Sequence, residues 1–173
     1  IVQIPRPTSG TVVLDPGSDR EAELTALHGE SLREVRPRLQ MIFQDPISSL
    51  NPRRFVRDIV AEGLAIWQKD HSGPHSRARS EEVLEAVGCD REVAATRRPH
   101  GFSGGQCQRS SIARAGARDP EILVSDEPVS ALDVSIQAQI INLLEALQTE
   151  FDLTYLFISH DLSVAVSYTQ RTP

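Results

Sequence analysis

Apolar residues along this chain follow two different spacings. Short apolar runs, each followed by polar or turn-forming residues, occupy 11–14, 39–43, 122–124 and 153–158. Such runs are typical of β-strands. Apolar residues spaced three or four positions apart occur in 55–67, in 81–87 and in a stripe formed by Ile136, Ile140, Leu143, Leu144 and Leu147. This spacing is typical of helices, so the pattern predicts an α/β fold.

A further helix is predicted from its start signal. Ser103 suits the N-cap position, and Gln106, three residues later, completes a capping box. The helix is expected to run to Asp119-Pro120, although Ser110, Ser111 and Gly116 weaken the signal. We expect a mostly helical subdomain at 46–119, and a core formed by 1–45 and 120–173.

The order strand, helix, strand between residues 122 and 158 predicts a right-handed crossover joining two parallel strands. Asp126, Glu127 and His160 then emerge at the same carboxyl edge of the sheet. Gln44 also follows a predicted strand, and in open α/β sheets ligands bind at this edge. The sequence therefore predicts one cavity shared by an acidic pair, a glutamine and an imidazole.

Composition excludes several classes of protein. The 24 acidic and 18 basic residues give a net charge of -6, which provides no positive field for nucleic acid, so no nucleic-acid partner is expected. No apolar run approaches the roughly 18 residues of a membrane-spanning helix, so direct membrane insertion is not expected. Cys89 and Cys107 lack the spacing of a zinc site or a disulfide framework, which favours a reducing cytosol.

Two adjacent carboxylates close the predicted strand at 122–124. The first, Asp126, suits Mg²⁺ binding, and the second, Glu127, suits orienting or deprotonating an attacking water in phosphoryl transfer. The alternative is a polar turn that follows a buried strand. Gln44, the turn at 103–106 and His160, each in a suitable element, favour the functional interpretation.

Gly104 and Gly105 leave backbone N–H groups open at a helix N-terminus, where a terminal phosphate of a nucleotide can approach. The alternative is an ordinary capped helix. His160 is a candidate for contacting a phosphate oxygen or polarising water, or else is a turn residue. Asp133 is expected to cap the helix that begins near Val134, a contribution of about 1 kcal/mol, or to shape a contact between subunits.

These residues, in this order, resemble the ATP-binding-cassette (ABC) ATPases over nearly the whole chain. The matching motifs are the signature at 102–106, the Walker B strand at 122–126, the catalytic glutamate Glu127, the D-loop at 130–133, the switch histidine His160 and the Q-loop glutamine Gln44. The stretches 44–53 and 126–139 resemble the dipeptide and oligopeptide importer branch, close to nickel importers.

The resemblance implies a P-loop NTPase-type core with a parallel sheet, a helical subdomain, and ATP and Mg²⁺ as cofactors. It implies catalytic roles for Glu127 and His160 and metal contacts from Asp126 and Gln44. The nucleotide-binding residues would be Gln44, Ser103, Gly104, Gly105, Gln106 and Asp133.

The implied partners are a second ATPase subunit in a head-to-tail dimer and membrane permeases, which would hold the protein at the cytoplasmic face of the membrane. Arg53 and Arg54 lie near the expected docking surface or in an ordinary exposed loop.

The sequence also departs from the family pattern. It contains no G-x-x-x-x-G-K-[ST] loop, and its one lysine is Lys69. Because Arg6-Pro7-Thr8-Ser9-Gly10-Thr11 resembles the segment after the phosphate-loop helix, and because 163–173 does not resemble the family's next strand, the ATPase core is expected to be incomplete at both ends. Gly101 and Cys107 replace the acidic residue and the arginine that are usual in relatives.

Two functions from different classes therefore compete. In the first, the chain is a fragment of the ATP-hydrolysing subunit of a peptide importer, with negligible activity by itself because the phosphate-binding loop is missing. In the second, it is a non-hydrolytic partner that lends its signature helix to a complete ATPase in trans. An ABC ATPase without a membrane partner is a third possibility, which the importer-like region after Gln44 disfavours.

Overall fold

A computed structural model describes residues 2, 6–67 and 74–160. Lys69 and the tail at 163–173 lie outside the described residues. The elements in chain order are β1 (Val13–Leu14), β2 (Ala22–Glu23), α1 (Gly29–Val35), the 3-10 helix η1 (Arg36–Arg38), β3 (Leu39–Ile42), α2 (Pro46–Ser49), α3 (Val56–Trp67), α4 (Pro74–Ala86), α5 (Arg91–Thr96), the 3-10 helix η2 (Pro99–Gly101), α6 (Gly104–Gly116), β4 (Ile122–Asp126), α7 (Val134–Phe151) and β5 (Thr154–Ile158).

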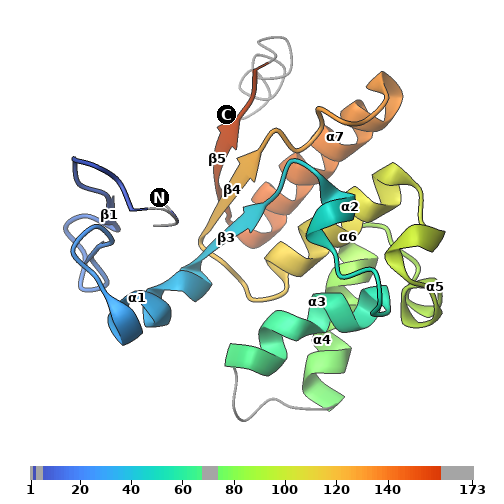
Figure 1. Cartoon of the computed structure of the whole chain (residues 1–173), viewed down its shortest axis with the longest axis horizontal. Coiled ribbons are helices and arrows are strands. Elements are labelled where there is room, and N and C mark those ends of the chain that lie inside the picture. The colour runs from blue at the N-terminus through green and yellow to red at the C-terminus, as the bar shows by residue number, and fades with distance from the viewer. Residues whose placement is uncertain (1, 3–5, 68–73, 161–173) are drawn as a thin grey trace.

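Three parallel strands form the centre of the fold, with β4 between β3 and β5 (Figure 1). Their register aligns Met41 with Val124 and Leu156. The helices α2 to α6 connect β3 to β4, and α7 connects β4 to β5. The predicted parallel arrangement is confirmed, and it brings the carboxyl ends of all three strands to one edge.

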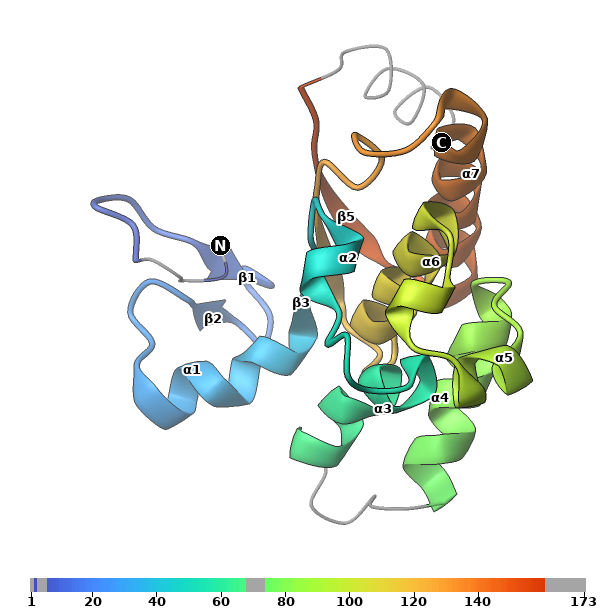
Figure 2. The same ribbon diagram turned by 45° about the vertical axis from the view of Figure 1, so that its right-hand side comes forward.

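One face of this sheet is buried against helices. Figure 2 shows α6 and α7 on the same side of the strands, and the apolar core joins residues of β3 and β4 to residues of both helices. Ile42 and Leu123 are at most 1% exposed, whereas Leu156 and Ile158 of β5 are 38% and 45% exposed. Close packing of this face against α6 and α7 holds β4 rigidly, and therefore also fixes the residues that follow the strand.

Helix α6 lies at the centre of the helical layer. It contacts α2, α3, α4 and α7 as well as β3. Its weak helix formers Ser110 and Ser111 are fully buried, and the Ser110 hydroxyl donates to the Gln106 carbonyl at 2.8 Å. Small side chains permit the close approach of several neighbours, so packing outweighs the low intrinsic propensity of these residues.

The segment from β1 to α1 lies on the other side of β3 from α6 and α7 (Figure 2). Arg38, at the amino end of β3, connects this segment to the sheet. Its Nε donates to both carboxylate oxygens of Glu121 at 3.0 Å, and its guanidinium also pairs with Asp15. Arg20 pairs with Glu121 from the loop after β1. Because the cluster joins Asp15 and Arg20 to Arg38 and the distant Glu121, it fixes the N-terminal segment against the amino end of β4.

Several element boundaries differ from the predictions. The strand expected at 11–14 is Val13–Leu14, and it pairs with the unpredicted antiparallel strand β2. The helix expected at 81–87 begins at Pro74 and ends at Ala86. The helices α1, α2 and α5 were not predicted, because they are four to seven residues long and carry too few apolar repeats to show a period. All helices from α2 to α6 lie within 46–119, and the division into a core and a subdomain stays a prediction.

Candidate functional site

The site begins where β4 ends. Asp126 is the last residue of the strand, and Glu127 follows with a φ of 45°, in the left-handed region that non-glycine residues seldom adopt. The Glu127 N–H donates to the Ile158 carbonyl at 2.9 Å, which ties it to the end of β5. The chain therefore turns sharply at Glu127 while its backbone stays attached to the sheet.

The Glu127 carboxylate contacts two other predicted site residues. The Gln44 side-chain amide donates to one oxygen at 2.8 Å, and His160 Nδ1 lies 2.8 Å from the other. The Glu127 side chain is 22% exposed and the His160 side chain 68% exposed. The carboxyl ends of all three strands thus contribute to one cluster, as the sequence predicted, and the carboxylate is oriented while remaining accessible.

The position of Gln44 is set by the helix start beside it. Asp45 is the N-cap of α2, and its carboxylate accepts from the N–H groups of Ile47 at 2.9 Å and Ser48 at 3.3 Å. Hydrogen bonds from Ser48 and Ile47 hold the pKa of Asp45 below its ordinary value. This cap was not predicted, although aspartate before a proline at the first helical position is a usual signal for one.

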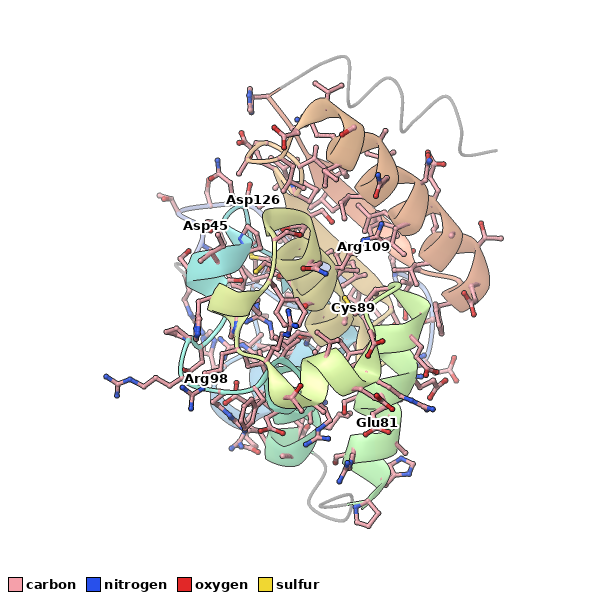
Figure 3. The ribbon with its side chains drawn as sticks, turned by 90° about the vertical axis from the view of Figure 1, so that its right-hand side faces the viewer. Asp45, Glu81, Cys89, Arg98, Arg109 and Asp126 are labelled. Carbon is pink, nitrogen blue, oxygen red and sulfur yellow. The ribbon has the colours of Figure 1, made fainter. Side chains whose placement is uncertain are left out.

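Asp126 and Gln44 line the same hollow. A cavity of about 480 Å³ is bounded by these two residues together with Phe43, Asp45, Ser48 and Ser49. Figure 3 shows Asp126 and Asp45 close to each other at this edge. Of the four residues expected to share one cavity, Asp126 and Gln44 line this space at the carboxyl edge of the sheet, whereas Glu127 and His160 do not.

The donor set fits a hard cation that takes its remaining ligands from a nucleotide. Among the described residues, no group of three or more histidine, cysteine or acidic side chains is placed to hold a metal. Asp126 supplies a carboxylate, and Gln44 has its carbonyl oxygen left for a cation because its amide donates to Glu127. Mg²⁺ is typically held by one or two protein oxygens together with water and phosphate oxygens, which is what this edge offers.

The signature-like turn forms as predicted at the start of α6. Gln106 N donates to the Ser103 hydroxyl at 3.3 Å, and the Gln106 side chain accepts from the Ser103 N–H at 2.9 Å. This capping box leaves the N–H groups of Gly104 and Gly105 without an acceptor inside the helix. In the part of the chain that the structure describes, no hydrogen bond or ion pair joins this turn to Gln44, Glu127 or His160.

The two glycines of the turn differ in their surroundings. A Cβ on Gly105 would lie 2.8 Å from Cγ2 of Ile136 in α7, closer than real contacts allow. A Cβ on Gly104 would meet Leu132 at 3.5 Å, an ordinary contact. Gly105 is therefore required for close approach of α6 to α7, a reason that differs from the phosphate approach expected from the sequence.

The predicted capping role of Asp133 is wrong in part. Asp133 occupies the N-cap position of α7, but its side chain makes no capping hydrogen bond. Its backbone carbonyl accepts from the N–H groups of Ile136 and Gln137, both at 2.9 Å. The side chain is exposed, so the expected 1 kcal/mol from a side-chain cap is not available here, and the alternative of a contact with another subunit stays a prediction.

Cys107, which replaces the arginine of the family pattern, lies in the interior. It is 1% exposed, packs with Leu50 and Ile59, and places its sulfur 3.4 Å from the Pro99 carbonyl. Burial raises the pKa of this thiol. The side chain at 107 therefore contributes to packing beneath the turn and is not exposed at the edge where phosphates would approach.

Comparison with known proteins gives a consistent family. The family model described as "ABC transporter" matches residues 1–130. The oligopeptide transport ATP-binding protein OppF of Bacillus subtilis is 53% identical over 149 residues, which cover 84% of this chain and 48% of the relative. The dipeptide transport ATP-binding protein DppF of Lactococcus lactis is 49% identical over 163 residues, which cover 94% of this chain and 51% of the relative. The chain spans about half the length of the curated relatives it matches.

Solved structures give the same fold. The dimeric ATP-binding cassette MJ0796 bound to ADP and phosphate superposes with a TM-score of 0.79 and 30% identity, covering 95% of this chain and 68% of the other. Part of a Clostridium perfringens ABC transporter complex, cbiO1, superposes with a TM-score of 0.73 and 26% identity, covering 90% and 61%. Across the residues that the structure describes, no helix combines the length and hydropathy needed to cross a bilayer.

Proposed function

Because this chain belongs to the ABC transporter ATPase family, we propose that it acts in the ATP-binding and ATP-hydrolysing subunit of a peptide importer. The observation that carries the proposal is the position of Glu127, at the end of a buried strand and in contact with both Gln44 and His160. The relatives are oligopeptide and dipeptide transport ATP-binding proteins, which supports peptides as the transported class.

In the proposed reaction Glu127 orients the attacking water and accepts its proton. Gln44 holds one carboxylate oxygen by its amide, which leaves the other facing His160. His160, exposed beside this oxygen, contacts the terminal phosphate or helps to polarise the water. Mg²⁺ bound with ATP, held from this chain by Asp126 and Gln44, would neutralise charge on the phosphate oxygens.

The signature-like turn would serve a second subunit. Its open N–H groups at Gly104 and Gly105 suit a terminal phosphate, yet among the described residues no hydrogen bond or ion pair joins the turn to the Glu127 cluster of the same chain. Together with Ser103, Gln106 and Asp133 it would complete the nucleotide site of a head-to-tail partner. The dimeric state named for the solved relative MJ0796 supports this arrangement. Permease subunits would hold the assembly at the cytoplasmic face of the membrane.

The 173-residue polypeptide by itself is proposed to have negligible ATPase activity. Its sequence contains no G-x-x-x-x-G-K-[ST] segment, and therefore no loop of this type to hold the β- and γ-phosphates. Asp126 and Glu127 would then have few further contacts with which to retain a nucleotide.

A chimera tests the proposal directly. The aligned part of this chain replaces its counterpart in Bacillus subtilis OppF, the relative that is 53% identical over 149 residues. We expect Mg-dependent ATP hydrolysis within about tenfold of the parent, measured by phosphate release. A chimera that folds and binds ATP but hydrolyses none would contradict the assignment of a catalytic Glu127.

A second function is favoured by the intact capping box at 103–106. A non-hydrolytic partner needs only this turn, which the structure forms completely. Mixing the chain with an ABC ATPase that has an intact phosphate loop but a disabled signature turn distinguishes the two functions. Restored turnover supports the second function, and no rescue supports the first.

A further inference from the structure

The loop between β4 and α7, residues 127–133, is held by a side chain that the proposed function does not use. Gln137 lies on the first turn of α7. Its side-chain nitrogen Nε2 donates to the Val129 carbonyl at 3.1 Å and to the Leu132 carbonyl at 3.0 Å. Both protons of one amide are therefore directed at two carbonyl groups of the same loop.

This double hydrogen bond takes the place of an ordinary helix cap. Asp133 stands at the N-cap position but makes no side-chain capping bond, so it does not fasten the loop to the helix. Gln137 reaches back eight residues to Val129, which is 4% exposed, and five residues to Leu132. The bond to a buried residue gives the loop a fixed point in the core.

The fixed loop joins two parts of the proposed machinery. At its start Glu127 contacts Gln44 and His160. Near its end Leu132 packs beside Gly104 of the signature-like turn, at 3.5 Å from a Cβ built there. A change in the position of this loop therefore moves Glu127 relative to Gln44, and Leu132 relative to the turn.

Internal bonds of the loop transmit the restraint. The Leu132 N–H donates to the Val129 carbonyl at 3.1 Å, so the two carbonyls that Gln137 holds belong to one turn. The Ser130 N–H and hydroxyl donate to the Glu127 carbonyl at 3.2 and 3.1 Å. Gln137 thus holds the carbonyl of the Val129–Ser130 peptide group, and the N–H of the same peptide group holds the Glu127 carbonyl.

We infer that Gln137 is a positioning residue, which holds the 127–133 loop so that the Glu127 carboxylate stays on Gln44 while Leu132 stays against Gly104. The inference rests on the proposed function in taking Glu127 as the catalytic base. The Gln137 side chain bonds to the backbone of the loop and is proposed to act through the loop alone.

The variant Gln137→Glu tests this inference, because a carboxylate has the same shape but no proton to donate near neutral pH, and it faces two carbonyl oxygens. In the ligand-free chain we expect the backbone amides of Ser130 and Leu132 to exchange at least tenfold faster, measured by NMR. The Gln44 side-chain amide signals should shift, because their hydrogen bond to Glu127 changes. Gln137→Met, equally long and uncharged, provides a second variant if the first does not fold.

Gln139→Glu is the matched control, since it makes the same chemical change on an exposed position of α7 whose amide oxygen meets Arg109 at 3.5 Å. The control should leave all these signals unchanged. Three results for Gln137→Glu would each overturn the inference. They are unchanged exchange at Ser130 and Leu132, faster exchange that extends through α6 as well, and unmoved Gln44 signals. Because no nucleotide is present, these outcomes do not depend on whether the chimera hydrolyses ATP.

Discussion

The two ends of strand β4 carry glutamates in very different surroundings. Glu121 immediately precedes the strand and accepts two hydrogen bonds of 3.0 Å from Arg38 Nε and one of 2.7 Å from its terminal nitrogen. Glu127 immediately follows the strand and meets the neutral amide of Gln44 and the imidazole of His160. One carboxylate is neutralised by arginines of the same chain, and the other pairs with no arginine among the described residues and keeps capacity for a ligand.

The difference separates a carboxylate that the fold itself neutralises from the one that we propose to be catalytic. The hydrogen bonds from Arg38 lower the pKa of Glu121, so its negative charge is stabilised by the fold itself. No arginine or lysine pairs with Glu127 among the ion pairs of the described residues. A carboxylate that pairs with no arginine or lysine of its own fold is the kind that a metal-nucleotide or an attacking water engages.

Exchanging each carboxylate for its amide gives the largest expected difference between the two ends. In the chimera, Glu127→Gln should lower ATP turnover at least 100-fold, the usual contribution of a general base, while the free energy of unfolding changes by less than about 0.5 kcal/mol. Glu121→Gln should do the opposite, with turnover retained and stability reduced. Steady-state phosphate release and chemical denaturation measure the two quantities. Equal losses of activity in both variants would remove the distinction between the two ends.

Removing the arginine at the amino end should have the next largest effect. Arg38→Met leaves Glu121 and Asp15 without their shared partner, and we expect a loss of about 2 kcal/mol in the free energy of unfolding, the range for hydrogen bonds to charged groups. Arg91→Met is the control, because its pair with Glu85 is more than half exposed on both sides and should contribute less than about 0.5 kcal/mol. Urea denaturation checks both. A loss no greater than the control's would mean that the cluster does not hold the N-terminal segment.

At the carboxyl edge, alanine substitutions at the two glycines of the signature-like turn should differ in their effect on stability. Gly105→Ala should cost about 1 kcal/mol or more, because its Cβ meets the stiff β-branched Ile136 at 2.8 Å. Gly104→Ala, with Leu132 at 3.5 Å, should be neutral or stabilising, since alanine is a better helix former. Thermal denaturation compares the pair.

A double variant with Ile136→Ala identifies the cause of the Gly105 effect. If the clash is responsible, the combined loss is smaller than the sum of the single losses. A fully additive result would mean that the backbone conformation of Gly105, and not its approach to Ile136, limits substitution.

Acid gives the smallest expected difference. Because the pKa of Glu121 is lower in the folded state, its stabilising contribution is complete above the unfolded value of about 4.3 and is lost as the pH falls through the lower folded value. As the pH falls below about 4.3, the free energy of unfolding should therefore decrease less in Glu121→Gln than in the parent chain. Denaturation curves at a series of pH values measure this, and parallel losses in both proteins would exclude the Arg38–Glu121 pair as the source.

The carboxyl edge was predictable from sequence because its signals are local. Each of β3, β4 and β5 contains a compact apolar run, and each is followed within two residues by a polar residue of the candidate site. Parallel pairing then brings Gln44, Glu127 and His160 together without further information. The same local logic predicted the capping box of Ser103 and Gln106, which lies within four residues.

The amino edge was not predictable, because its contacts are long-range and its elements short. Arg38 and Glu121 are 83 residues apart, and neither stands in a motif that indicates the other. Strand β2 has two residues, too few to show an alternation. The missing cap at Asp133 has a related cause, since a cap-like position gives no information about where the side chain will point. Gln137, a polar residue inside an amphipathic helix, likewise gave no signal of its bonds to the preceding loop.

The left-handed backbone at Glu127 creates a conflict between two kinds of selection. Glycine adopts a φ of 45° without steric cost, whereas a glutamate there gives up of order 1 kcal/mol. A library of this chain screened for thermal tolerance alone should therefore accumulate glycine at 127, and one screened for turnover in the chimera should keep glutamate. Selection for stability and selection for turnover would thus favour different residues at 127, if Glu127 is the catalytic base that we propose.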